Sequence, residues 1–206
     1  MNQGLRERQK ASRRARILES ARKKFQDAGY VNVKIEDIAN DSDVSAVTVY
    51  NYFGSKAGLL LALVGESDLI LIRKLDELVT KSHENLISAV QEFGRILRQH
   101  AMTFLQKPTW REVISASIHE GSREFGKTYS ELDDVLIGKM RDLLAALQVN
   151  KLVSPDVDIC VLADCLFSLQ NIRFFQFIAD DTLGIEKSDI KLQQDLMALQ
   201  AVFAQK

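Results

Sequence analysis

Residues 35–56 read IEDIANDSDVSAVTVYNYFGSK, and they carry the most informative pattern in the chain. Its first six residues, 35–40, place three apolar side chains at helical spacing, in a segment too short to be a stable helix unless it packs against another element. Residues 41–43 are Asp, Ser and Asp, a composition typical of a turn. Ser45 can then cap a second helix over residues 46–53, because its hydroxyl can accept a backbone N–H two or three residues on. The stretch therefore predicts two short helices joined by a tight turn, a helix-turn-helix.

The rest of the chain also favours helices. Its 206 residues include only two prolines and ten glycines, and scarce breakers favour long helices over many short strands. Apolar residues at helical spacing predict helices over 13–28, 56–78, 84–106, 110–121, 129–149, 156–179 and 188–204. Gly29 and Gly54 are expected to close the helices before them, Pro108 to stop the helix before it, and Ser188 to cap the last helix. The sequence predicts an all-α fold, with an N-terminal head of three small helices followed by a larger helical bundle.

Charge is unevenly distributed, although the formal net charge of the chain is only −1. Residues 1–24 hold nine Lys or Arg against two Glu, whereas residues 61–206 hold 16 Lys or Arg against 21 Asp or Glu. A basic head on an acidic body indicates that only the head meets a polyanion. A solvated basic tail would have the same composition, so charge alone leaves both interpretations open.

Membrane and secreted proteins fit this sequence poorly. The basic start is not followed by an apolar segment, so no secretory signal is expected. The apolar segment 157–179 is interrupted by charged residues, whereas a membrane span needs about 20 nearly charge-free residues. Cys160 and Cys165 lie in that one segment and form no disulfide framework, which favours a reducing cytoplasm. Cys165 is expected to be a buried small hydrophobe, with redox sensing as the alternative.

No motif for catalysis or for a bound metal is present. His83, His100 and His119 are scattered, and there is no His-Glu-x-x-His and no Cys-x-x-Cys pair. The chain also has no glycine-rich phosphate loop and no nucleophile elbow. The sequence therefore predicts a protein that is not an enzyme and that has no metal and no cofactor.

The amino-acid sequence around the turn closely resembles that of one protein family. Five short motifs strongly resemble the signature of the TetR family of transcriptional regulators: Ile38-Ala39, Val44-Ser45, Thr48-Val49-Tyr50, Tyr52-Phe53 and Ser55-Lys56. The resemblance covers about residues 11–72. It implies a DNA-binding domain over 11–71, with the helix-turn-helix at about 34–53, and a helical ligand-binding and dimerisation domain over 72–206. It also implies a homodimer that acts on a palindromic operator, most simply a repressor released by an unknown small-molecule effector.

The last helix of a helix-turn-helix enters the major groove N-terminus first. The resemblance implies that Thr48 and Tyr50 touch phosphates and base edges, that Tyr52 reaches the backbone, and that Lys56 clamps a phosphate. The full expected set of DNA contacts is Arg13, Arg14, Lys34, Ser45, Ala46, Val47, Thr48, Tyr50, Asn51, Tyr52 and Lys56. Residues 46–50 include no Arg, Asn or Gln, so we expect thymine methyl contacts and DNA shape to provide much of the specificity.

Two positions depart from the TetR pattern. Lys34 stands where the family usually has threonine, and its ammonium can pair with a phosphate but cannot cap the helix. Asp43 stands in the turn where the family favours glycine, and aspartate tolerates the left-handed conformation better than most residues. The resemblance therefore survives both changes.

The segment 157–179 is apolar nearly all round, which is typical of a helix buried on several sides. The resemblance implies that the last two helices pair with their copies in a two-fold dimer, although a core helix in a monomer is the alternative. The expected interface residues are Leu162, Leu166, Leu169, Phe174, Phe177, Leu196, Leu199 and Phe203. Candidates for an effector pocket, each of which could instead be core, are Phe93, His100, Phe104, Trp110, His119, Tyr129, Cys165 and Gln170.

The expected partners are therefore double-stranded DNA, a second copy of the chain and an unidentified small molecule, with no membrane. The rival interpretation is a helical module whose basic head binds an acidic protein or a membrane surface. Salt titration on duplex DNA separates the two, because phosphate contacts weaken steeply as salt rises.

Overall fold

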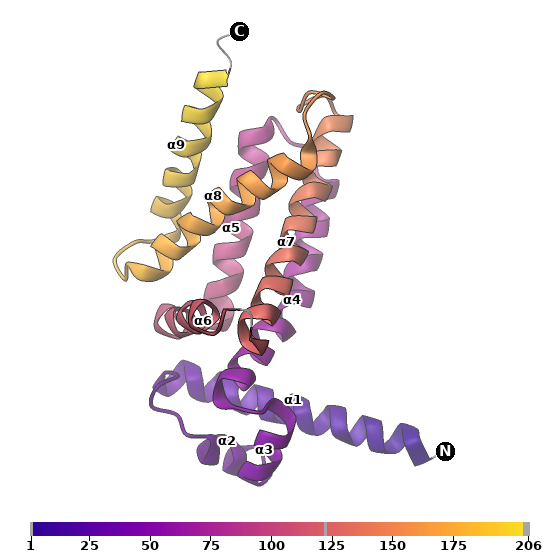
Figure 1. Ribbon diagram of the computed structural model, residues 1–206, viewed down its shortest axis with the longest axis vertical. Coiled ribbons are helices and arrows are strands. Elements are labelled where there is room, and N and C mark those ends of the chain that lie inside the picture. The colour runs from indigo at the N-terminus through magenta and orange to yellow at the C-terminus, as the bar shows by residue number, and fades with distance from the viewer. Residues whose placement is uncertain (1, 122, 204–206) are drawn as a thin grey trace. The chain divides into compact units, whose positions relative to one another are not determined.

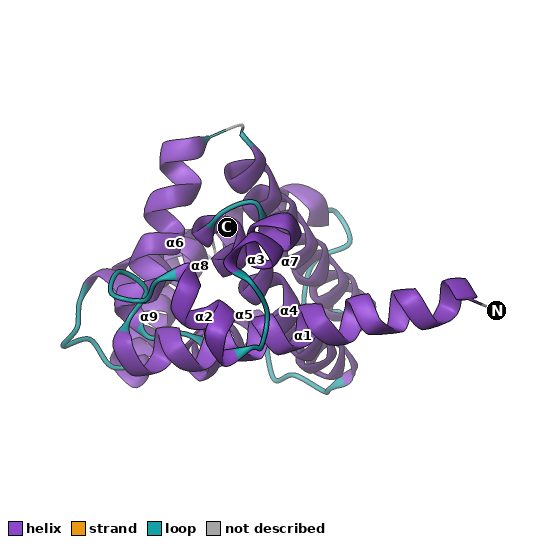
Figure 2. Cartoon of the chain, turned by 90° about the horizontal axis from the view of Figure 1, so that it is seen from below, coloured by secondary structure: helices purple, strands orange, loops and turns teal. Residues whose placement is uncertain are grey.

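The computed structural model describes residues 2–121 and 123–203, and it describes their side chains except those of residues 2, 3, 67, 68, 124, 202 and 203. Every regular element in this part of the chain is an α-helix, so the predicted all-α fold is confirmed (Figures 1 and 2). The helices are α1 (Asn2–Ala28), α2 (Ile35–Asp41), α3 (Ala46–Phe53), α4 (Lys56–Thr80), α5 (Leu86–Phe104), α6 (Lys107–Glu120), α7 (Glu124–Val149), α8 (Ile159–Ala179) and α9 (Ile185–Phe203).

The chain divides into two compact units. The head unit comprises Met1–Ser67 and Phe104–Tyr129, and the body unit comprises Asp68–Thr103 and Ser130–Lys206. Helix α6 thus belongs to the same unit as α1 to α3, whereas it was expected within the second domain, residues 72–206. Helix α4 begins in the head unit and ends in the body unit.

Several predicted helix ends differ from the structure, and α7, for example, begins at Glu124 rather than at Tyr129. Helix α1 begins at Asn2 rather than at Arg13, because nothing stronger than Gly4 breaks a run of good helix formers. Pro108 does not end α5; it lies in the first turn of α6, where a missing N–H leaves no hydrogen bond unmade. Ser188 does not cap α9, which begins at Ile185; it is buried inside that helix, and its N–H donates to the Gly184 carbonyl at 3.1 Å.

The head unit is built on one small core. Buried apolar side chains from the three N-terminal helices meet there: Ile17, Leu18, Ala21, Phe25, Ile35, Ile38, Ala39 and Val49. The two glycines expected to close helices do so, with φ of 78° at Gly29 and 70° at Gly54. Asp43 has a φ of 55°, so the turn adopts the left-handed conformation that the sequence required of it.

The body unit has a larger core. Its helices bury a single apolar cluster that includes Leu75, Phe93, Leu143, Phe167 and Leu192. Ion pairs tie the last helix to its neighbours. Asp189 of α9 accepts hydrogen bonds from two arginines of α5, and the Asp195 carboxylate accepts two from Arg173 of α8, each 2.5 Å long.

One carboxyl in the body unit has a shifted pKa. Asp133 of α7 is half-buried and shares a hydrogen bond with Asn171 of α8. Burial, and secondarily the negative charge of Asp134, raise the pKa of Asp133 from 3.8 to about 6, which the hydrogen bond partly opposes. Since the folded pKa is the higher one, the folded chain binds the extra proton. The contribution of Asp133 to stability is therefore lost as pH rises from about 4 through about 6.

We expect Asp133→Asn to raise the free energy of unfolding at pH 7.5 by about 1–2 kcal/mol, a value discounted for the partial exposure of the group. Urea denaturation followed by circular dichroism at pH 4.5 and pH 7.5 measures the effect, which should shrink at the lower pH. Asp156→Asn, at an exposed position of the body unit that does not contribute to the pKa of Asp133, is the matched control. An equal difference between variant and wild type at both pH values would contradict the assignment.

Candidate nucleic-acid interface

Helix α3 has one buried and one exposed face. Val49 is 1% exposed and packs into the head core, whereas Val47 is 66% exposed and Tyr50 46% exposed. Asn51 is also exposed, and Ala46, Thr48 and Tyr52 are half-buried. Phe53, one helical turn after Val49, is half-buried. The exposed face carries no charged side chain.

The turn before α3 is fixed by short-range hydrogen bonds. The Ser45 hydroxyl accepts from the Thr48 N–H at 3.2 Å, so the predicted cap is confirmed, and the two hydroxyl oxygens lie 2.9 Å apart. The Ser42 hydroxyl donates to the Ile38 carbonyl at 2.7 Å, and the Val44 N–H donates to the Ala39 carbonyl at 3.0 Å. These bonds set the start of α3 rigidly against the end of α2, so the exposed face of α3 has a fixed orientation in the head.

Lys34 lies just before α2, with an exposed side chain. The Asp37 carboxylate accepts the Lys34 backbone N–H at 3.0 Å and so caps the start of α2, a contact that the sequence reasoning missed. The pattern of an acid three residues after the cap position could have predicted it. The Lys34 ammonium makes no cap bond.

The two arginines of the N-terminal pair differ. Arg14 pairs with Glu66 at 2.6 Å, and its guanidinium carbon lies 5.6 Å from the centroid of the Phe53 ring. Arg13 is exposed. The Tyr52 hydroxyl donates to the backbone carbonyl of Lys10 at 3.4 Å. Helix α1 is therefore attached to the C-terminal end of α3 by side chains from both helices.

The ammonium of Lys56 already makes contacts within the head unit. Its ammonium lies 4.4 Å from the centroid of the Tyr30 ring and donates to the Val31 carbonyl at 3.3 Å. Burial lowers the pKa of Lys56, and the negative charge of Glu112 on α6 acts in the opposite direction. Tyr30 and Glu112 were not singled out from the sequence, because only the fold brings them to Lys56.

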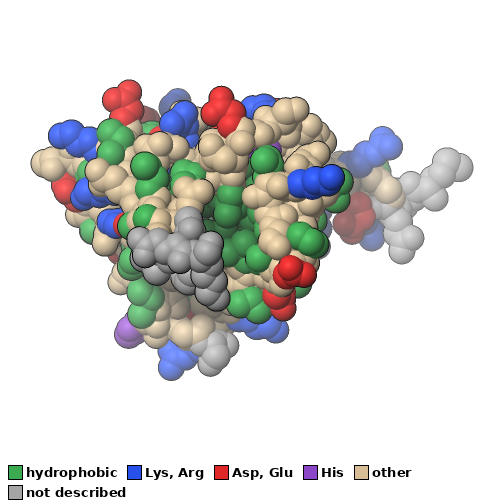
Figure 3. Space-filling view, turned by 90° about the horizontal axis from the view of Figure 1, so that it is seen from above, with side chains coloured by type: hydrophobic (Ala, Val, Ile, Leu, Met, Phe, Trp, Pro, Cys, Tyr) green, Lys and Arg blue, Asp and Glu red, His purple; other side chains and the backbone are tan. Residues whose placement is uncertain are grey.

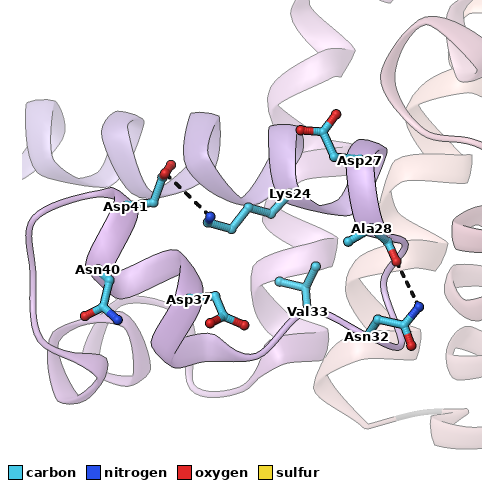
Figure 4. A pocket seen from close by; sticks show the side chains of 8 residues that line it. All are labelled: Lys24, Asp27, Ala28, Asn32, Val33, Asp37, Asn40 and Asp41. Carbon is cyan, nitrogen blue, oxygen red and sulfur yellow. Dashed lines mark hydrogen bonds and ion pairs between the residues drawn. The ribbon is translucent and has the colours of Figure 1, made fainter.

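A second surface of the head unit, formed by α1, α2 and the loop between them, has a different chemistry (Figure 4). An open depression of about 560 Å³ is lined by Lys24, Asp27, Ala28, Asn32, Val33, Asp37, Asn40 and Asp41. Lys24 pairs with Asp41 at 3.5 Å, which leaves an excess of carboxylates. Within the described residues, no group of three His, Cys, Asp or Glu side chains is placed to hold a metal ion. A surface of this charge repels phosphate, so the α3 side is the better interface for DNA.

The expected pocket residues fall into both units. Phe93, His100 and Gln170 are buried in the body unit; Phe104, Trp110 and Tyr129 lie buried or half-buried in the head unit; His119 and Cys165 are exposed. The expectation that Cys165 is a buried small hydrophobe is therefore wrong, because it lies on the side of α8 that faces away from the core of the chain. The effector site itself stays a prediction.

The expected dimer residues lie mostly inside a single chain. Leu166, Phe174, Phe177 and Leu196 are buried, Leu162 and Leu169 are half-buried, Leu199 is exposed, and the side chain of Phe203 lies outside the described residues. Buried side chains have little surface left for contact with a second chain, and the dimer interface itself stays a prediction. The same two helices expose other apolar side chains to solvent, namely Val161, Ile172, Ile190 and Met197. Figure 3 shows exposed hydrophobic side chains among charged ones on the surface of the molecule.

Comparisons with known proteins agree with this geometry. Residues 17–63 match the sequence model of the bacterial regulatory proteins, tetR family. Among curated protein sequences, none matches the chain. None of the helices within residues 2–121 and 123–203 is long and apolar enough to cross a membrane.

Solved structures share the fold over nearly the whole chain. A structure described as a TetR-family transcriptional regulator from Mesorhizobium loti has a TM-score of 0.69 at 19% identity, covering 93% of this chain and 96% of that one. FadR from Bacillus subtilis, in complex with stearoyl-CoA, has a TM-score of 0.63 at 12% identity, covering 87% and 95%. A transcriptional regulator from Saccharomonospora viridis, in complex with choline, has a TM-score of 0.64 at 22% identity, covering 89% and 95%. Residues 17–63 therefore carry the sequence pattern of the tetR family of bacterial regulatory proteins, and the chain shares the fold of solved structures described as TetR-family transcriptional regulators.

Proposed function

We propose that the chain is a homodimeric, sequence-specific transcription regulator, a repressor that a small molecule releases from a palindromic operator. The observation that carries the proposal is the uncharged, outward face of α3, held at a fixed angle by the capped turn before it. An α-helix fits the major groove of B-form DNA, and a helix-turn-helix inserts its second helix there.

Contacts on α3 favour thymine. Val47 is exposed and apolar, and the methyl group of Thr48 lies on the next residue, so both can pack against thymine C5-methyl groups. Tyr50 and Asn51 are exposed beside them and offer a hydroxyl and an amide for phosphates or base edges. The basic residues of the head then supply the phosphate contacts that give affinity without specificity.

The exposed apolar residues of α8 and α9 support dimerisation. Val161, Cys165 and Ile172 recur along α8 at the spacing of one helix face, and Ile190 and Met197 do so along α9. A second copy of the chain would cover both rows, and a two-fold dimer presents two α3 helices to two half-sites. Charge pairs such as Arg173–Asp195 keep α8 and α9 together as one surface.

Release by an effector follows from linkage. A small molecule that binds the body unit more tightly when the two heads are arranged unfavourably for DNA lowers the affinity of the dimer for DNA. Bound DNA lowers the affinity for the small molecule by the same free energy. The ligands named with two similar structures, stearoyl-CoA and choline, support a small-molecule effector without fixing its class.

Selection of bound sequences from a random duplex pool tests the proposal. A palindrome with thymines in each half-site is the expected result, with affinity falling steeply as salt rises. A strictly G·C-rich half-site would contradict the thymine contacts. Binding without preference over random competitor would contradict DNA recognition altogether and favour a module that binds acidic proteins or membranes.

Two substitutions test the individual contacts. We expect Thr48→Ala to weaken operator binding about tenfold, because one polar contact and one methyl contact are lost, at about 1–2 kcal/mol together.

Lys56→Met keeps the aliphatic stem near Tyr30 and should reduce the slope of log affinity against log salt by about 1 if the ammonium meets a phosphate. Fluorescence anisotropy at several salt concentrations measures both.

Thr103→Ala, an exposed threonine of the body unit, is the matched control for Thr48→Ala. An unchanged salt slope in Lys56→Met, together with a lower melting temperature, would assign Lys56 to holding Tyr30 and the chain around Val31 in place. Retention of full operator affinity by Thr48→Ala would remove Thr48 from the interface.

A further inference from the structure

Helix α1 is much longer than the head core requires. Its first buried side chain is Ile17, and residues 4–16 are exposed except for the half-buried Arg14. At 1.5 Å per residue, the part of α1 before Ile17 extends about 20 Å. Figures 1 and 2 both show the N-terminal end of α1 projecting beyond α2 and α3. We call residues 4–16 the α1 extension.

The α1 extension carries six basic side chains against one acidic side chain: Arg6, Arg8, Lys10, Arg13, Arg14 and Arg16 against Glu7. Arg14 pairs with Glu66, and among the described residues no ion pair involves the other five. Five unneutralised cations on one exposed helix form a concentrated positive surface.

This helix is electrostatically unfavourable by itself. Arg6 and Lys10 lie one turn apart, as do Lys10 and Arg13 or Arg14, and like charges at such spacing destabilise a helix. Its first turn contains no acidic residue, so nothing complements the positive end of the helix dipole. A bound polyanion would offset both costs.

The chemistry of one surface on the extension fits phosphate. An open depression of about 490 Å³ is lined by Arg8, Gln9, Ser12, Arg13 and Arg16. Each of these side chains can donate hydrogen bonds, and none is a carboxylate. Guanidinium groups bind phosphate oxygens through paired N–H donors.

The extension is also placed beside α3. The Tyr52 hydroxyl near the end of α3 donates to the Lys10 carbonyl, and Arg14 lies over the ring of Phe53. A duplex whose major groove holds α3 therefore has its sugar-phosphate backbone within reach of a helix anchored at that same end of α3. Charge complementarity makes this backbone the occupant that fits the extension best.

We propose that the α1 extension is a second DNA-binding element, which lies on the phosphates flanking the half-site read by α3 and is stabilised as a helix by them. The proposal rests on the proposed DNA-binding function and adds a sequence-independent contact outside the half-site. It requires contacts to phosphates only, so the extension should increase affinity equally for every duplex.

The test replaces Arg6, Arg8 and Arg16 together by glutamine, which retains good helix propensity. The slope of log affinity against log salt should fall by about 2.7 per chain, since each phosphate contact contributes about 0.9. Affinity at 0.15 M salt should fall at least tenfold, by the same factor for the selected operator and for a random duplex. Hydroxyl-radical footprints of the variant should lose protection at the flanks and keep it at the half-sites.

A matched control replaces Arg73, Lys74 and Lys187 by glutamine, three exposed basic residues of the body unit, with the same change in net charge. Its salt slope should stay close to that of the wild type. An unchanged slope and footprint in the extension variant, with operator preference intact, would overturn the proposal while leaving the proposed function standing. Absence of operator preference in the wild-type protein would instead contradict the proposed function itself.

Binding to anionic vesicles tests whether the extension binds the phosphates of lipid headgroups rather than those of DNA. Wild type and the extension variant are compared for binding to vesicles of phosphatidylserine and phosphatidylcholine at the same salt concentration. A loss of vesicle binding in the variant with no change in DNA affinity would overturn the proposal in favour of a membrane-surface element.

Discussion

Asp189→Ala is expected to lower the free energy of unfolding by about 3–5 kcal/mol, because it leaves a buried guanidinium without its counter-charge. Arg98 is 0% exposed, and Asp189 accepts from its Nε at 2.9 Å and its Nη2 at 2.5 Å. Arg95 Nε donates to the other oxygen of the same carboxylate at 2.8 Å. Burial lowers the pKa of Arg98, and the hydrogen bond and charge of Asp189 oppose that shift.

Urea denaturation followed by circular dichroism measures the loss. The double variant Arg98→Met with Asp189→Leu is the informative control, because it removes the charge and its partner together and should recover most of the stability. Asp195→Ala, whose ion pair with Arg173 is partly exposed, should lose much less. A loss below about 1 kcal/mol in Asp189→Ala would show that water reaches the guanidinium.

Val47→Asp is expected to weaken operator binding by at least 100-fold, which corresponds to about 3 kcal/mol. Val47 is 66% exposed in the first turn of α3, so a carboxylate there would face the phosphates and replace an apolar contact with thymine methyl groups. The fold should be unaffected, because the site is exposed and an acid in the first turn suits the helix dipole.

Fluorescence anisotropy on the selected operator measures this loss, and the melting temperature checks that the fold is intact. Val149→Asp introduces the same charge at an 80% exposed valine of the body unit and is the matched control. Equal operator affinity in the two variants would mean that α3 does not enter the groove with this face.

Arg98 illustrates what sequence patterns fail to predict. A charged residue in an amphipathic helix is ordinarily placed on the solvent side. The one hint in the sequence that Arg98 is buried was Gly94, one helical turn earlier. A Cβ added at Gly94 would lie 3.0 Å from Arg98 Nη2 and 2.8 Å from a methyl carbon of Leu192. Because Gly94 has no side chain, the space beside it is filled by the Arg98 guanidinium. The sequence alone did not identify Asp189 as its partner, because 91 positions separate the two residues.

The helix-turn-helix, by contrast, was predictable in detail. The Ser45 cap, the left-handed Asp43 and the closing Gly54 are each decided by residues within about one helical turn. The exposed and buried faces of α3 follow from the 3.6-residue period, since Val49 and Tyr50 are neighbours in sequence but point to different sides.

Local patterns in the chain were enough to predict which segments are helical, where the turn lies and which face of α3 is exposed, because these features depend on contacts between near neighbours in the chain. The packing of the helices was needed to establish that Arg14 pairs with Glu66, that Lys56 lies over Tyr30, and that Arg98 is buried against Asp189. It also decided that Leu166 and Leu196 are buried while Val161 and Met197 are exposed on the same two helices. Those outcomes depend on which helix packs against which, and helical periodicity carries no information about the identity of the neighbour.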